Sequence, residues 1–134
     1  MMRDLHNSTT IGGGIKAVSL VATDLNGTAT PFDMSDLQAA EVVFSAGVHA
    51  GTGTALPVIL ESDDGTTWGT TAQADMLGTP VAITSVSDDV TEQKIGYVGN
   101  KRYISPAWDA TGTPTIPVSA SCIGHRRRHI GTTT

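Results

Sequence analysis

Cysteine, aromatic side chains and charge are all scarce in this sequence of 134 residues. Cys122 is the only cysteine, which excludes an intrachain disulfide and a zinc site made of several cysteines. Aromatic residues make up 4% of the chain and charged residues 16%. Such low charge excludes a highly charged disordered chain, and it also excludes a long solvated helix or coiled coil.

Long apolar runs are missing as well. No stretch approaches the roughly 18 apolar residues that a membrane-spanning helix needs. The first seven residues, MMRDLHN, lack the apolar centre of a signal peptide. We therefore expect no membrane partner and no secretory leader.

The abundant residues are those that form strands and turns. The 15 glycines and 6 prolines, together with many threonines, divide the chain into short alternating segments separated by turn signals. A chain of this length suits one domain that buries about two-thirds of its surface. Residues 15–124 are therefore predicted to form a single all-β domain, a β-sandwich or jelly-roll-like fold of about eight short strands. The expected strands cover residues 15–23, 41–46, 55–62, 66–68, 81–86, 93–98, 101–108 and 115–123.

Several segments are expected to lie outside these strands. Residues 1–14 end in a run of three glycines and are predicted to form a flexible, extended N-terminal arm. Residues 125–134 are predicted to form a polar, basic C-terminal tail. Residues 47–54 and 109–114 are interpreted as loops rich in glycine or proline, and residues 72–77 as a single helical turn.

Charge is distributed unevenly along the chain. The segment from Ala17 to Gln93 carries eleven acids and no lysine or arginine, whereas six basic residues and one acid follow from Lys94 onward. Patches of opposite sign favour self-assembly or docking on a complementary surface. An acidic body disfavours nucleic-acid binding, which needs a broad basic face. The alternative is that both signs only solvate the surface.

The densest group of carboxylates lies in a predicted hairpin turn. Glu61, Asp63 and Asp64 could contribute to a calcium site, but a calcium ion needs six to eight oxygen ligands and the EF-hand spacing is missing. An acidic turn closed by Gly65 explains the same residues. The segment through Trp68 also resembles the Asp-box hairpin of sialidase-type propellers, with one residue fewer between serine and glycine, which leaves carbohydrate binding open.

The remaining motifs do not indicate a metal site, a cofactor site or a catalytic site. His125 and His129 have the spacing of a helical metal pair, but no glutamate follows His125 and three arginines separate the two. Cys122 lies within an apolar alternation and is interpreted as a small core residue. We find no phosphate-binding glycine loop and no nucleophile motif. We therefore expect no enzyme activity, no cofactor and no metal.

Four segments stand in a characteristic order and spacing: residues 60–65 (LESDDG) with Trp68, residues 75–78 (DMLG), residues 95–104 (IGYVGNKRYI) and residues 124–126 (GHR). In this order and spacing the chain resembles the head decoration (cement) proteins of tailed bacteriophages. The resemblance implies a virion protein without catalysis that attaches to a shell of major capsid protein, on the capsid surface, after assembly in the host cytoplasm.

A shell protein of this kind gains avidity from many copies, so we expect a homo-oligomer, a trimer at three-fold positions of the shell. Two alternatives remain open: a tail or connector component of the virion, and a carbohydrate-binding β-sandwich. The residues expected at an interface are Ile11, Ile15, Lys101, Arg102, Arg126, Arg127 and Arg128.

Overall fold

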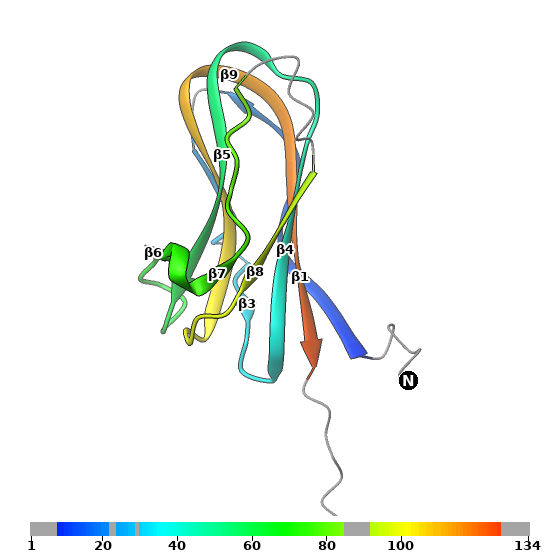
Figure 1. Ribbon diagram of the computed structural model, residues 1–134, viewed down its shortest axis with the longest axis vertical. Coiled ribbons are helices and arrows are strands. Elements are labelled where there is room, and N and C mark those ends of the chain that lie inside the picture. Colours follow the sequence, from blue (N-terminus) through cyan, green and yellow to red (C-terminus); the bar gives the residue numbers. More distant parts are fainter. Residues whose placement is uncertain (1–7, 22–23, 29, 85–91, 127–134) are drawn as a thin grey trace, which may run out of the picture.

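The computed structural model describes residues 8–21, 24–28, 30–84 and 92–126. The strands among them form one sheet in which every pairing is antiparallel (Figure 1). The prediction of an all-β, single-domain fold is confirmed. The strands are β1 (Thr9–Val21), β2 (Leu25–Asn26), β3 (Phe32–Asp33), β4 (Leu37–Ala46), β5 (Ala50–Ser62), β6 (Gly69–Thr70), β7 (Met76–Leu77), β8 (Glu92–Tyr97) and β9 (Tyr103–Arg126).

The sheet is organised around β9. On one edge, residues 103–115 of β9 pair with β5 and residues 118–126 pair with β4. On the other edge, β9 pairs with β3, β2 and β1. β9 and the β4–β5 segment bend together, so the sheet curls over into two facing layers (Figure 1). One layer holds β5 with the first half of β9, and the other holds β4 with the second half.

Residues 71–84, which follow β6, link β5 to β8 at one side of the curled sheet. They include a short 3-10 turn, η1 (Gln73–Asp75), and then β7, which pairs with β8. The side-chain amide of Gln93 in β8 bonds the backbone N and O of Val81, both at 2.8 Å. Ile83 then bridges to Ala55 of β5. The helical turn expected over residues 72–77 is thus present, but only over three residues.

The core fills the space between the two layers. Side chains alternate along the second half of β9, where Ile116, Val118, Ala120 and Cys122 are buried. This alternation is the one that the sequence predicts, because neighbouring residues of a strand point to opposite faces. The largest fully buried side chains are Trp108, Phe44, Leu20, Ile59, Ile95, Ile104, Ile116 and Val42.

Two segments predicted as loops belong to the sheet instead. Residues 50–54 pair with residues 111–115 as the continuation of β5 and β9. The Oγ1 atoms of Thr52 and Thr113 lie 2.8 Å apart across this ladder. Glycines with positive φ, such as Gly53 (φ 108) opposite Gly112 (φ 79), allow the two backbones to approach closely there. Only residues 47–49 connect β4 to β5.

The predicted boundaries of the arm and the tail also need correction. Residues 9–14 are part of β1, where Thr9 pairs with His125 and Gly12 with Cys122. His125 and Arg126 are part of β9. The strand ladder therefore extends further toward both ends than the run of glycines and the basic residues indicate. Residues 1–7 and 127–134 lie outside the described residues.

Candidate functional site

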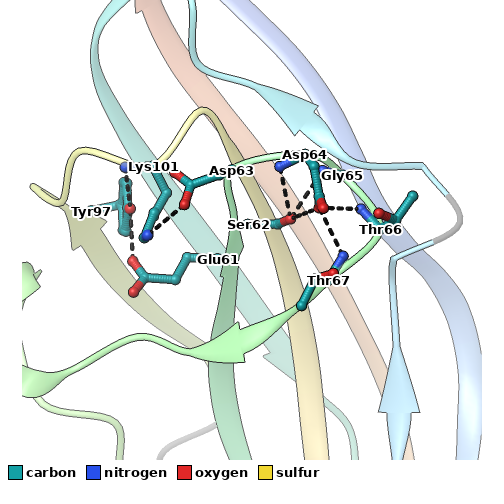
Figure 2. Close-up of polar contacts among 9 residues, drawn as sticks. All are labelled: Glu61, Ser62, Asp63, Asp64, Gly65, Thr66, Thr67, Tyr97 and Lys101. Carbon is teal, nitrogen blue, oxygen red and sulfur yellow. Dashed lines mark hydrogen bonds and ion pairs between the residues drawn. The ribbon is translucent and has the colours of Figure 1, made fainter.

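The carboxylates singled out in the sequence gather at one corner of the molecule, where β5 turns into β6. We call residues 61–68, together with Tyr97 and Lys101, the acidic corner (Figure 2). β5 supplies Glu61 and Ser62, and the hairpin loop supplies the rest of the segment. Tyr97 closes β8, and Lys101 lies in the connection from β8 to β9.

Asp64 holds the hairpin loop together. Its Oδ1 accepts the backbone N–H groups of Thr66 and Thr67, both at 2.8 Å, and the hydroxyl of Ser62 at 2.9 Å. Ser62 is 2% exposed, and its Oγ accepts the backbone N–H of Gly65 at 2.9 Å. The backbone bonds from Thr67 and Thr66 hold the pKa of Asp64 well below its usual range. The carboxylate therefore stabilises the loop and remains ionised.

A second set of contacts ties the hairpin to the β8–β9 connection. The hydroxyl of Tyr97 donates to Glu61 Oε2 at 2.8 Å and accepts the backbone N–H of Lys101 at 3.1 Å. Lys101 Nζ lies 2.7 Å from Asp63 Oδ2. Burial, followed by the bond to Glu61, raises the pKa of Tyr97, and the bond to Asp63 raises the pKa of Lys101. Both groups keep their protons at neutral pH.

The corner encloses an open depression of about 450 Å³. Its walls combine the indole of Trp68 with the side chains of Glu61, Asp63 and Lys101. A Cβ added to Gly69, which also borders the depression, would meet nothing within 4 Å. An aromatic wall beside hydrogen-bond acceptors and one donor suits a ligand rich in hydroxyl groups. In the part of the chain that the structure describes, no cluster of three His, Cys, Asp or Glu side chains could hold a metal ion.

A further ion pair lies near the start of β9. Arg102 binds Asp33 through Nε at 3.2 Å and Nη2 at 3.1 Å, and its guanidinium lies 5.0 Å from the centre of the Tyr103 ring. The hydrogen bonds from Arg102, then from the backbone of Ser35, lower the pKa of Asp33 to about 2. This pair joins β3 to the residue that precedes β9, across 69 residues of sequence.

The residues expected at an interface that the structure describes have different surroundings. Ile11 is 71% exposed on β1, whereas Ile15 is partly buried against the core. Lys101 and Arg102 are both engaged with carboxylates of their own chain. Arg126 is exposed at the end of β9. Arg127 and Arg128 lie outside the described residues.

Cys122 and His125 have structural contacts. Cys122 is fully buried and its Sγ lies 3.6 Å from the carbonyl oxygen of Gly13, which agrees with its interpretation as a core residue. His125 Nδ1 lies 3.1 Å from the carbonyl oxygen of Ser8. His129 is outside the described residues, so the expected coincidence of the two histidines is not examined by the structure.

The sequence did not predict the hydrogen bonds that join distant loops at the acidic corner. Glu61 and Tyr97 are separated by 36 positions, and no local pattern connects them. Only the Ser-Asp-Asp-Gly turn carried a recognisable signal, because serine and aspartate side chains commonly bond the backbone two or three residues further on.

No membrane-spanning helix is found among the described residues. No protein-family model matches the sequence, no curated protein matches it, and no solved structure matches the fold.

Proposed function

We propose that this chain is a non-enzymatic structural protein of a tailed-phage virion, which decorates and stabilises the capsid by binding the shell of major capsid protein as a homo-oligomer. The resemblance of the sequence to decoration proteins suggests the proposal. The observation that supports it best is that the ionisable side chains at one end of the molecule are bonded to other parts of the same chain. Asp33, Tyr97, Lys101 and Arg102 each bond a neighbouring loop or strand of the same chain, and Asp64 bonds the backbone of its own hairpin loop.

These bonds fix the loops before any partner binds, and a fixed surface is well suited to docking. A surface whose loops are already fixed loses little conformational freedom when it binds. That matters for a protein that occupies many equivalent positions, because every copy must present the same shape. The core between the two layers of one continuous sheet also makes the whole domain rigid, which serves the same purpose.

Exposed apolar side chains provide contact area. Ile11 is 71% and Val98 is 53% exposed. Both lie toward the end of the molecule that holds the start of β1 and the end of β8 (Figure 1). Single exposed apolar residues are ordinary on protein surfaces, but these two lie at the same end of the molecule as the fixed loops. This end is therefore the proposed contact with the shell.

A carbohydrate-binding role is the second candidate. The depression beside Trp68, with carboxylates and one lysine around it, favours it. Binding on a glycan array that is lost in Trp68→Ala and in Gly69→Leu would support this role. If no glycan gives a signal, or if the signal is unchanged in both variants, the carbohydrate-binding role is contradicted.

The decisive experiment mixes the purified chain with shells assembled from the major capsid protein encoded in the same genome. We expect co-sedimentation and a reconstruction with hundreds of copies per shell, whereas about a dozen copies at one vertex would favour a connector. Ile11→Asp should weaken binding about tenfold, the effect of losing one apolar contact. Val48→Asp, in the β4–β5 turn at the opposite end, is the matched control. No binding to shells would contradict the proposal.

A further inference from the structure

One surface of the curled sheet has neighbouring apolar residues on its solvent side. In β4 the side chains of Val42 and Phe44 are buried, so Glu41 and Val43 point outward, because neighbouring residues of a strand point to opposite faces. Side chains at paired positions of adjacent strands share a face, which extends this surface across β9, β4, β8 and β7. We define the outer face by the residues Ile123, Glu41, Val43, Lys94, Gly96 and Leu77.

The apolar part of the outer face is a strip that runs from Val43 on β4 to Leu77 on β7. Leu77 is 63% exposed, and its side chain lies over Gly96, because a Cβ added to Gly96 would meet Leu77 Cβ at 3.1 Å. Val43 is half-buried. Antiparallel sheets that face water usually present polar residues there, so an apolar strip in this position favours contact with another surface.

Two side chains of opposite charge lie on opposite sides of this strip. Glu41 pairs directly with Gly96, and Lys94 precedes Gly96 by two positions on the same strand. The Cβ atoms of such diagonal neighbours are about 7–8 Å apart. In the part of the chain that the structure describes, neither side chain has an ion-pair partner. The outer face therefore offers one carboxylate and one ammonium group to a surface with the matching charges.

We propose that the outer face binds the outer face of a second copy of this chain across a two-fold axis. An axis that lies in the plane of the contact, along the strip from Val43 to Leu77, places Glu41 of each copy against Lys94 of the other. The apolar side chains near the axis meet their own counterparts in the second copy. A two-fold contact needs a self-complementary surface, and an apolar strip between opposite charges is such a surface.

This dimer is one form of the homo-oligomer in the proposed function, and it rests on that function. The strip is inclined to the strands, so the two sheets cross at a large angle, which is one of the two usual arrangements of packed sheets. The unit that docks on a shell is then a dimer, and not the trimer expected from three-fold positions. Ile11 lies one strand beyond Ile123, at the margin of the contact, and stays available for the shell.

Charge reversal tests the pairing, with self-association of the full chain measured by sedimentation equilibrium. We expect Glu41→Lys and Lys94→Glu each to raise the dimer dissociation constant at least about tenfold, because each variant places two like-charged pairs in the contact. An equimolar mixture of the two variants should form heterodimers as tightly as the unmodified protein forms homodimers, since every pair then joins opposite charges. Lys16→Glu, an exposed position on β1, is the matched control and should leave dimerisation unchanged.

The mixture also shows that the two variants are folded, because only folded chains can restore the contact. A monomer at every protein concentration, a trimer, or a mixture that associates no more tightly than its separate components would overturn the proposal. Co-sedimentation with shells is measured separately on the unmodified protein. Shell binding by a protein that stays monomeric would overturn the dimer and leave the shell contact in place, whereas a dimer that ignores shells would support the outer face and contradict the proposed function.

Discussion

The ring of Phe44 in β4 meets the ring of Trp108 in β9 edge to face, with centroids 5.5 Å apart and planes at 89°. The two residues belong to opposite layers of the curled sheet, and neither is more than 1% exposed. Edge-to-face pairs add attraction beyond the area that they bury. This pair therefore joins the two layers at the centre of the core.

Phe44→Ala should cost about 3–5 kcal/mol of unfolding free energy, because it removes a large buried side chain and leaves a cavity under Trp108. Urea denaturation followed by tryptophan fluorescence measures the change. Val48→Ala, at a site 76% exposed, should stay within about 0.5 kcal/mol. Similar losses in the two variants would contradict the central position of the ring pair.

Gly65→Ala should destabilise the protein by about 1–2 kcal/mol through backbone strain alone. Gly65 has φ 78, which is unfavourable for a residue with a Cβ. The nearest neighbour of an added Cβ is the Tyr103 ring at an ordinary 3.6 Å. Gly69→Ala is the matched comparison in the same hairpin, since nothing lies within 4 Å there; it should leave the midpoint of thermal unfolding unchanged or raised. A smaller loss at Gly65 than at Gly69 would show that the turn does not constrain the fold.

The ion pair of Asp33 and Arg102 should make stability depend on acid pH. Hydrogen bonds from Arg102 and Ser35 lower the pKa of Asp33 from 3.8 to about 2 in the folded protein. A carboxyl with a lower pKa in the folded state stabilises the fold above the unfolded pKa, and this contribution disappears as pH falls from about 4 to about 2.

Urea midpoints measured between pH 2 and pH 7 check this dependence. The urea midpoint of the Asp33→Asn variant should fall less steeply with decreasing pH than that of the unmodified protein. Arg102→Gln should behave in the same way, because it removes the principal cause of the shift. Both side chains are solvent-accessible, so salt should reduce the difference. Parallel curves for all three proteins would show that the pair does not contribute.

Cys122 should resist thiol reagents in the folded protein. It is fully buried, and this burial raises the pKa of its thiol to about 12, so little reactive thiolate exists at pH 8. Reaction with Ellman's reagent should be at least about a hundredfold slower than in denaturant. Ser121→Cys, an exposed neighbour in the same strand, should react at an ordinary rate. Fast reaction of the native thiol would mean that β9 opens readily.

The strands that could be predicted are those with a clear alternation of apolar and polar residues. Apolar and intervening residues alternate without interruption from 116 to 122, and Ile116, Val118, Ala120 and Cys122 form the buried face of this part of β9. Residues 109–114 contain glycine, threonine and proline, which locally favour a loop. They form a strand because their partner, residues 51–56 of β5, contains Gly51 and Gly53 and can follow the same bend. This match involves two distant segments, so neither segment reveals it alone.

Two prolines lie inside strands that the sequence predicts, residues 101–108 and 115–123, and β9 contains both of these segments from residue 103 onward. Pro106 and Pro117 lie inside β9, where the missing N–H would ordinarily interrupt a ladder. Their carbonyl oxygens still accept bonds, from Gly27 N at 3.0 Å and from Gly47 N at 2.7 Å. In the acidic corner the turn residues were predictable, whereas the bonds from Tyr97 and Lys101 depend on how β8 and β5 are brought together.

β9 is the last of the described strands to be synthesised, yet β1, β4 and β5 all depend on it as a neighbour. While residues 103–126 are still inside the ribosome, β4 can pair only with β8 and β5 only with the short β6, and β1 lacks the strand that it pairs with in the sheet. The two layers can therefore be joined only after β9 has been translated, and pairings so distant in sequence form slowly. Until then its strand edges are exposed, so during biosynthesis this protein depends on protection from aggregation.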